Sequence, residues 1–440
     1  MQRFASALVC LTGVILCSPA AALAQAPSSW KQRLVVETID GAPLDFVTSE
    51  HGWQDAGAVV GLGLHSFGDD GSGLASEKLL EALGLDPNVA YVALDGAARS
   101  PEDCDVFDPY SVQQCTIGFL DGQSSQGKYD AQSWMSEYGI LEVQSKVVGA
   151  PQLVAVIDSG LDLGHPVFAG RLASEGWDYV LSKPGAWDVP NGTDEDGDGF
   201  VDEAFGHGTH VASLIALVDP NALLLPYRVV DADGRGWAFD VAQAVVQATL
   251  DGADVINLSL SVEPHSEALR TAIEFALLNG ADVISSAGNS GQDEVLFPAS
   301  MEHKDIQGWI KMLAPHGVVA VAALGEEGQM AAFSSHGKQV DLAAPGVDLY
   351  GALPGGQWGW WSGTSMATAV VSGSASLLRS TSQLSSWVPA DVLLVDVSAP
   401  LESPTVSEDN EEDEELEDAP KKSAFGRLDL FSAYLANPIP

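Results

Sequence analysis

The chain has 440 residues, 46% of them hydrophobic, which is enough for one large domain with an ample core and a smaller one beside it. Its 61 acidic and 19 basic residues give a net charge of −42. A chain this acidic repels nucleic acid and anionic membrane surfaces, so neither is an expected partner. Self-repulsion also keeps it soluble, and salt or calcium would screen that repulsion.

Residues 1–24 have the features of a secretory signal peptide. Arg3 gives a positive start, residues 4–17 an apolar core, and residues 22–24 a small-residue cleavage site. The apolar run is too short for an N-terminal membrane anchor, and no other segment is long and apolar enough to span a bilayer. We therefore expect a secreted protein, located extracellularly, in a periplasm or at the cell surface.

Residues 25–115 form a segment whose pattern differs from the rest and predicts a small α+β domain. Strand-like runs lie at 34–36, 59–62 and 89–92, and a short helix is expected at 77–83.

Cysteine usage agrees with export. Cys10 and Cys17 would leave with the signal peptide, so Cys104 and Cys115 remain as an even pair. In an exported protein, such a pair predicts one local disulfide.

Residues 116–440 are expected to form one domain, and from residue 151 on the chain alternates between strand and helix patterns. This predicts an α/β domain with a mostly parallel sheet covered by helices on both faces. An acidic insertion at 402–420 interrupts the domain and is expected to be a solvated surface loop. The expected strands are 153–158, 223–230, 254–260, 282–286, 317–323 and 340–343, and the expected helices are 207–218, 238–251, 265–279, 364–380 and 424–436.

Three stretches in this domain carry residues suited to nucleophilic catalysis. The buried strand VAVID ends in Asp158, and α/β active sites lie at the carboxyl ends of strands. His207 opens the helical stretch GHGTHVA, where an imidazole could take a proton. Ser365 lies in the first turn of a helix that begins at Thr364, beside backbone N–H groups that could hold an oxyanion.

These blocks resemble the subtilisin-like serine proteases. VAVIDSGLD, GHGTHVAS and SGTSMATA match that family in the family's own order, as do DVINLSL, SSAGNSG, FPAS and AAFSSHGKQVDLAAPG. The matches cover about the last two thirds of the chain. The resemblance implies that Asp158 orients the histidine, His207 is the general base and acid, and Ser365 is the nucleophile.

The resemblance also implies supporting residues. Asn289 would donate a hydrogen bond to the oxyanion from its side chain. The family usually has two glycines after Ser-Leu, whereas this chain has Ser261 and Val262, whose side chains could narrow the specificity pocket. Substrate preference therefore does not carry over. The implied substrate-binding residues are Leu258, Ser259, Leu260, Ser261, Ser286, Ala287 and Gly288.

The stretch DPNVAYV, residues 86–92, resembles the last strand of the inhibitory propeptides that precede many subtilases. It predicts that residues 25–115 bind the peptidase domain, residues 116–440, and restrain it. The alternative is a small structural domain with no inhibitory role.

The acidic stretch at 194–203 carries separate chemistry. Alternate carboxylates, a glycine at the sixth place and an acid at the ninth predict a loop that binds a structural Ca²⁺ ion. The usual glutamate at the twelfth place is replaced by Phe205, and Glu203 could substitute for it. The alternative is an acidic solvent loop. The expected ligands are Asp194, Asp196, Asp198, Phe200, Asp202 and Glu203.

Other conspicuous residues have plainer interpretations. His210 lies three residues beyond His207, but HGTH lacks the acid of a zinc-protease motif, so we expect a packed core histidine. The stretch from Trp358 to Ser362, just before the nucleophile, is rich in glycine and aromatic residues with no steady period, which predicts a loop that leads into the helix. Its Trp358, Trp360 and Trp361 either line a substrate cleft or pack in the core.

The sequence thus predicts a secreted, monomeric serine endopeptidase that cleaves proteins or peptides through an acyl-enzyme and has its own propeptide as a partner. The main alternative is a non-catalytic, calcium-stabilised exported scaffold of the same fold, and the intact triad with Asn289 argues against it. An esterase or amidase of the α/β-hydrolase kind would need a Gly-x-Ser-x-Gly elbow, which is absent around Ser365.

Overall fold

The computed structural model describes residues 32–39, 44, 47–48, 52–59, 62–69, 76–100, 119–120, 125–146, 149–194, 198–301, 317–381, 399–400 and 426–436. The predictions for the signal peptide, for the Cys104–Cys115 pair and for the acidic insertion concern residues outside these ranges. None of the helices among the described residues has the length and apolar character needed to cross a membrane.

A ten-stranded sheet forms the centre of the molecule, in the order β19-β20-β16-β15-β14-β12-β7-β10-β8-β9. Neighbouring strands from β20 to β8 are parallel, and β19 and β9 add antiparallel edges. The central strands are almost wholly apolar because both faces of the sheet are covered. The strands are β7 (Leu153–Asp158), β8 (Trp177–Asp178), β9 (Lys183–Pro184), β10 (Leu223–Arg228), β12 (Val255–Leu258), β14 (Asp282–Ser286), β15 (Val319–Leu324), β16 (Leu342–Pro345), β19 (Ala399–Pro400) and β20 (Gly426–Arg427).

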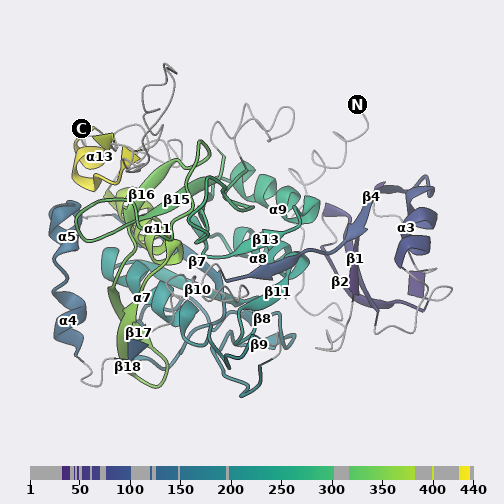
Figure 1. The fold of residues 1–440 in the computed structure, drawn as a ribbon, viewed down its shortest axis with the longest axis horizontal. Coiled ribbons are helices and arrows are strands. Elements are labelled where there is room, and N and C mark those ends of the chain that lie inside the picture. Colours follow the sequence, from purple (N-terminus) through teal and green to yellow (C-terminus); the bar gives the residue numbers. More distant parts are fainter. Residues whose placement is uncertain are drawn as a thin grey trace, which may run out of the picture.

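Two pairs of helices cover the sheet (Figure 1). Helices α7 (His207–Val218) and α11 (Thr364–Thr381) pack into the core of one face, while α8 (Ala238–Leu250) and α9 (Glu267–Leu278) pack into that of the other. Every residue of α7 is buried, and in α11 all but Arg379 are. The small side chains of α11 permit this close packing. The predicted α/β fold is therefore confirmed.

The N-terminal segment forms a separate small sheet with its own core. Strands β2 (Gln54–Val59), β3 (Leu64–Asp69), β1 (Gln32–Thr38) and β4 (Val89–Leu94) are antiparallel in that order. Helix α3 (Ser76–Gly84) packs on them through Leu79 and Leu83, which are fully buried. In Figure 1 this domain lies at one end of the long axis.

Two three-stranded antiparallel sheets lie outside the central sheet. In one, β5 (Ala97–Arg99) lies between β11 (Arg235–Trp237) and β13 (Ser261–Glu263), and in the other β18 (Gln357–Trp361) lies between β17 (Leu349–Leu353) and β6 (Phe119–Leu120). The remaining short elements are α4 (Gln126–Asp130), α5 (Trp134–Glu137), α6 (Ile140–Gln144), the 3₁₀ turn η3 (Pro166–Phe168) and α13 (Leu430–Ala436).

Several element predictions were wrong in detail. The helix expected at 424–436 begins only at Leu430, because Gly426 and Arg427 pair with β16 at the edge of the sheet. The strand expected at 59–62 is β2, which ends at Val59, and the pattern missed β3. The expected strand 254–260 stops at Leu258 and resumes as β13.

Candidate active site

Asp158 is the last residue of β7, which lies between β12 and β10 in the parallel part of the sheet. Its carboxylate is 1% exposed. Oδ1 accepts hydrogen bonds from the Ser159 N–H and from His207 Nδ1, both at 2.7 Å. Because Nδ1 then carries the proton, Nε2 is the nitrogen that can act as a base.

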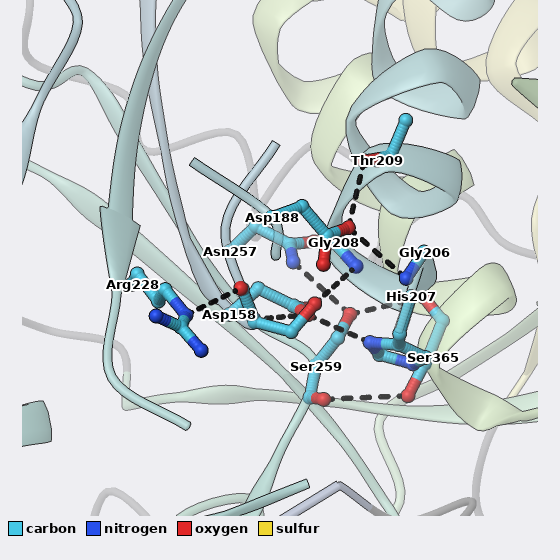
Figure 2. A network of polar contacts seen from close by, with 11 residues as sticks. Asp158, Asp188, Gly206, His207, Gly208, Thr209, Arg228, Asn257, Ser259 and Ser365 are labelled. Atoms are coloured by element: carbon cyan, nitrogen blue, oxygen red, sulfur yellow. Dashed lines mark hydrogen bonds and ion pairs between the residues drawn. The ribbon is translucent and has the colours of Figure 1, made fainter. Parts of the chain in front are cut away.

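His207 is the first residue of α7, which lies against β7 at close range. A Cβ at Gly208 would be 2.2 Å from Gly160 O and 3.0 Å from Asp158 Oδ1, so only glycine permits this approach. The Trp361 ring packs edge-on to the His207 ring with centroids 5.4 Å apart. Figure 2 draws the imidazole between Asp158 and the Ser365 side chain.

Ser365 is the second residue of α11 and is fully buried. Its hydroxyl donates to Ser259 O at 3.4 Å, and its carbonyl accepts from Ser259 Oγ at 3.1 Å. Asn257 on β12 donates to Ser259 Oγ at 3.0 Å and accepts from Ser372 on α11 at 2.8 Å. These bonds fix the start of α11, with its outward N–H groups, against the end of β12.

Asn289 lies beside the same helix start. Its Oδ1 accepts hydrogen bonds from the Thr364 N–H and the Thr364 hydroxyl, both at 2.9 Å. The Gly288 N–H donates to Thr364 Oγ1 at 3.3 Å. This network assigns the acceptor end of the amide, so the NH₂ end is the one that could donate to an oxyanion.

The residues predicted to bind substrate lie around Ser365. Ser259 contacts the serine directly, and Ser261 begins β13. Most of the set is buried at the ends of β12 and β14, with exposed fractions of 0 or 1% for Leu258, Leu260, Ser286 and Ala287. One edge of β13 is occupied by β5 of this chain.

Strand β5 points toward the nucleophile. Arg99 pairs with Ser261 on one side and with Arg235 on the other, and the Ser100 N–H donates to Gly234 O at 2.9 Å. Since Ser261 is two residues from Ser259, the end of β5 lies close to the segment that contacts Ser365. An extended strand paired on both edges is how many proteins hold a bound peptide.

A buried ion cluster, which no sequence pattern predicted, joins the N-terminal domain to α8. Arg33 on β1 donates to both carboxylate oxygens of Asp240, at 2.8 and 3.0 Å, and lies 3.4 Å from Asp95. Asp95 Oδ1 accepts the Phe239 N–H at the start of α8. Burial raises the pKa of Asp95 to about 7, opposed by Arg33 and assisted by Asp240.

In the described part of the expected calcium loop, the carboxylates accept main-chain N–H groups. Asp202 binds Asn191 and Gly192 at 2.7 and 2.9 Å, Asp194 binds Gly199, and Asp198 binds Phe200. Asp196 is outside the described residues. Among those described, no three His, Cys, Asp or Glu side chains cluster closely enough to hold a metal ion, so calcium binding stays a prediction.

The other conspicuous residues have clear places. His210 is a packed core residue, as predicted, with Nε2 3.1 Å from Leu349 O. The Trp358–Ser362 stretch, interpreted as a loop, is strand β18 up to Trp361, because β17 and β6 pair with it. Trp358 packs against Tyr129 and His165 in the core.

The parallel α/β fold and the grouping of Asp158, His207 and Ser365 define a subtilisin-like class of protein. Residues 149–414 match the subtilase family, Peptidase_S8. Subtilisin E of Bacillus subtilis (strain 168) is 32% identical over 329 residues, which cover 72% of this chain and 71% of that protein. The chain belongs to the subtilase family, that of the subtilisin-like serine proteases.

Other relatives match a smaller share of their own length. A thermophilic serine proteinase of Bacillus sp. (strain AK1) is 35% identical over 239 residues, and the match covers 52% of each chain. Fervidolysin from Fervidobacterium pennivorans, a keratinolytic enzyme related to subtilisin, has a similar fold with a TM-score of 0.67 and 21% identity. That likeness covers 94% of this chain and 62% of fervidolysin.

Proposed function

We propose that this chain is a secreted serine endopeptidase that works through an acyl-enzyme. The observation that carries the proposal is the 2.7 Å contact between His207 Nδ1 and Asp158, beside a serine at the start of a buried helix. The acid fixes the imidazole tautomer and stabilises the imidazolium that forms during turnover. Family membership and the named serine proteases among its relatives support the same reaction.

In the first half-reaction, Ser365 Oγ attacks the peptide carbonyl carbon while His207 Nε2 takes the hydroxyl proton. The carbonyl oxygen becomes an oxyanion, which the Ser365 N–H and the Asn289 NH₂ group would hold. When the intermediate collapses, the C–N bond breaks and His207 gives its proton to the leaving amine. The product is an ester between Ser365 and the acyl half of the substrate.

The second half-reaction restores the enzyme. Water attacks the ester carbonyl and gives a proton to His207. Collapse of the second tetrahedral intermediate then breaks the ester bond and returns that proton to Ser365 Oγ, while the peptide acid leaves. A dry site strengthens each of these interactions, and both Ser365 and His207 are at most 1% exposed.

The test is Ser365→Ala, which should abolish nearly all hydrolysis of a chromogenic peptide and all labelling by a serine-directed phosphonate. Residual catalysis from the oxyanion hole is small beside this loss. Hydrolysis by Ser365→Ala at a rate within about tenfold of wild type would contradict the proposal. An unlabelled, inactive wild-type protein would instead favour the alternative of a non-catalytic scaffold.

We also propose that residues 25–115 act as an inhibitory propeptide. Support comes from β5, which fills the space between β11 and β13 and runs toward Ser365. N-terminal sequencing of secreted wild-type protein beside Ser365→Ala tests this. A mature N-terminus beyond residue 100 in wild type, absent in the variant, would support self-cleavage, and identical termini would contradict it.

The acidic loop at 194–203 is proposed to hold a structural Ca²⁺ ion. Its donor set fits the ion, because carboxylate and main-chain carbonyl oxygens are the ligands that Ca²⁺ prefers. The expected ligands remain Asp194, Asp196, Asp198, Phe200, Asp202 and Glu203. A bound ion would order the approach to His207, which follows four residues after Glu203.

A further inference from the structure

A third carboxylate lies beside the proposed triad. Asp188 follows a bridge that joins Leu161 to Trp187, and its N–H donates to Leu161 O at 2.9 Å. It is 6% exposed. Asp188 therefore lies next to the turn that leaves β7 just after Asp158, although the two acids are 30 residues apart in the chain.

Oδ2 of Asp188 accepts two hydrogen bonds from residues on either side of His207. Gly206 donates its N–H at 3.1 Å, and Thr209 donates its hydroxyl at 2.8 Å (Figure 2). Thr209 Oγ1 in turn accepts the Asp162 N–H at 2.9 Å. One carboxylate thus ties the first turn of α7 to the segment that follows β7, and His207 lies between two anchored residues.

The start of α7 needs an anchor from elsewhere because its own N-cap residue cannot supply one. Gly206 has no side chain and adopts a left-handed φ of 99°. A Cβ at this position would lie 3.0 Å from Pro354 Cδ, which disfavours a serine or aspartate there. Helix N-termini favour a nearby carboxylate, and Asp188 provides it across space.

We infer that Asp188 is a positioning residue for His207: through Gly206 and Thr209 it fixes how the imidazole meets Asp158 and Ser365, and its negative charge favours the imidazolium during turnover. This inference rests on the proposed function, because it concerns the surroundings of that function's general base. Asp188 itself touches neither substrate nor the reacting atoms.

The electrostatic part of this role has identifiable contributors. Burial raises the pKa of Asp188 to about 7, the bonds from Thr209 and Gly206 oppose that rise, Asp158 on β7 adds to it, and Arg228 on β10 opposes it. Arg228 is held by Ser159 O and by Asp178. A carboxyl whose pKa is about 7 changes charge in the pH range where a histidine base does, so both groups would contribute to the pH dependence of turnover.

The first test is Asp188→Asn, which keeps the shape and one acceptor oxygen but removes the charge. We expect kcat to fall about 10- to 100-fold with little change in KM, because the base and not the substrate is misplaced. The acid limb of the kcat–pH profile should change from a two-proton to a one-proton dependence.

The matched control is Asp219→Asn. Asp219 is a buried carboxylate at the opposite end of α7, where it accepts hydrogen bonds from Ser376 and Asn221. This variant should lower thermal stability and leave the shape of the kcat–pH profile unchanged. Comparing the two variants separates the general effect of neutralising a buried carboxylate next to α7 from an effect that acts on His207.

A second readout needs no turnover. In Ser365→Ala protein, the His207 imidazole is titrated by NMR, and its signal is assigned by its loss in the Ser365→Ala/His207→Gln double variant. Adding Asp188→Asn should lower the midpoint by about 0.5 to 1 pH unit, because a nearby negative charge is removed. If the chain is not a peptidase, wild type shows no turnover, yet this titration still tests the inference.

Thr209 variants test the same inference if Asp188→Asn does not fold. Thr209→Val deletes the hydroxyl that binds Asp188, and Thr209→Ser keeps it, so kcat should fall in the first and recover in the second. The inference would be overturned if Asp188→Asn changed neither the kcat–pH profile nor the midpoint of the His207 titration. Thr209→Val protein with the kcat of wild type would also overturn it.

Discussion

Arg33 and Asp240 are 207 positions apart and form a buried, two-bond ion pair between the N-terminal domain and helix α8. Arg33 also donates to Ser66 Oγ at 3.1 Å on the neighbouring strand β3. Fork-shaped pairs of this kind combine strength with a fixed geometry. The pair therefore fixes how the small domain sits against α8, and with it the position of β5.

The first prediction concerns this pair. Arg33→Leu leaves Asp240 buried without its cation, which costs about 3–5 kcal/mol in buried pairs of this kind. Added in trans, residues 25–115 should inhibit the mature enzyme, and the Arg33→Leu segment should do so at least about 100-fold more weakly. Lys78→Ala, at an exposed position of α3, is the control. No inhibition by the unaltered segment at micromolar concentration would count against the propeptide role.

The second prediction is a pH dependence of docking through Asp95. Its side chain is fully buried in the docked state, where its pKa is raised from 3.8 to about 7. Because the docked carboxyl has the higher pKa, protonation of Asp95 stabilises the docked state, and this stabilisation is complete below pH 3.8. It is lost as the pH rises from 3.8 to about 7, and docking does not change further with the ionisation of Asp95 above that pH. Inhibition by the N-terminal segment should therefore weaken between about pH 4 and 7.

Asp95→Asn should remove most of this pH dependence, because asparagine keeps an acceptor for the Phe239 N–H and does not titrate. Glu81→Gln, at an exposed position of α3, should leave the dependence intact. The measurement is the inhibition constant across the pH range. An equal slope in wild type and Asp95→Asn would assign the dependence to other groups.

The third prediction concerns the oxyanion. Asn289→Leu keeps the volume but removes the NH₂ donor, so kcat should fall about 10²–10³-fold with little change in KM, a magnitude taken from a subtilisin oxyanion-hole asparagine. Asn279→Leu, at an exposed position after α9, is the matched control and should have wild-type kinetics. A loss that falls wholly in KM would mean that Asn289 positions substrate only.

What the sequence could predict was local. The strand before Asp158, the helix from His207 and the helix from Thr364 each follow from a short periodic run, and the structure has all three at those residues. The loop prediction for the stretch before Ser365 was wrong. Residues Trp358 to Trp361 do not alternate between apolar and polar side chains, and they form a strand because they pair with β17 and β6.

Contacts between residues far apart in the chain could not be predicted from the local sequence pattern. Asp188 precedes His207 by 19 residues and belongs to no motif, and Arg33 reads as an ordinary charge beside a strand. The role of each residue depends on a contact that only the folded chain forms: Asp188 is buried against Thr209, and Arg33 is buried against Asp240. A buried charge needs such a partner, so these residues report tertiary structure that no local propensity encodes.

The last prediction concerns calcium. Asp194, Asp196, Asp198 and Asp202 place four negative charges within nine residues. Without a cation these charges repel one another, and a bound ion would replace that repulsion with coordination and link stability to calcium concentration. Because His207 follows so closely, chelation should lower Tm and slow turnover. Calcium should restore both better than magnesium, which prefers a rigid octahedral shell.

Two controls separate coordination from screening. High sodium chloride should recover only part of the lost Tm, because screening relieves repulsion without supplying ligands. Asp196→Asn combined with Asp198→Asn should weaken the response to calcium, whereas Glu326→Gln combined with Glu327→Gln, an exposed acidic pair elsewhere, should leave it intact. If the Asp196/Asp198 double variant keeps the full calcium dependence of wild-type Tm and turnover, the ion binds elsewhere and this loop is an acidic surface only.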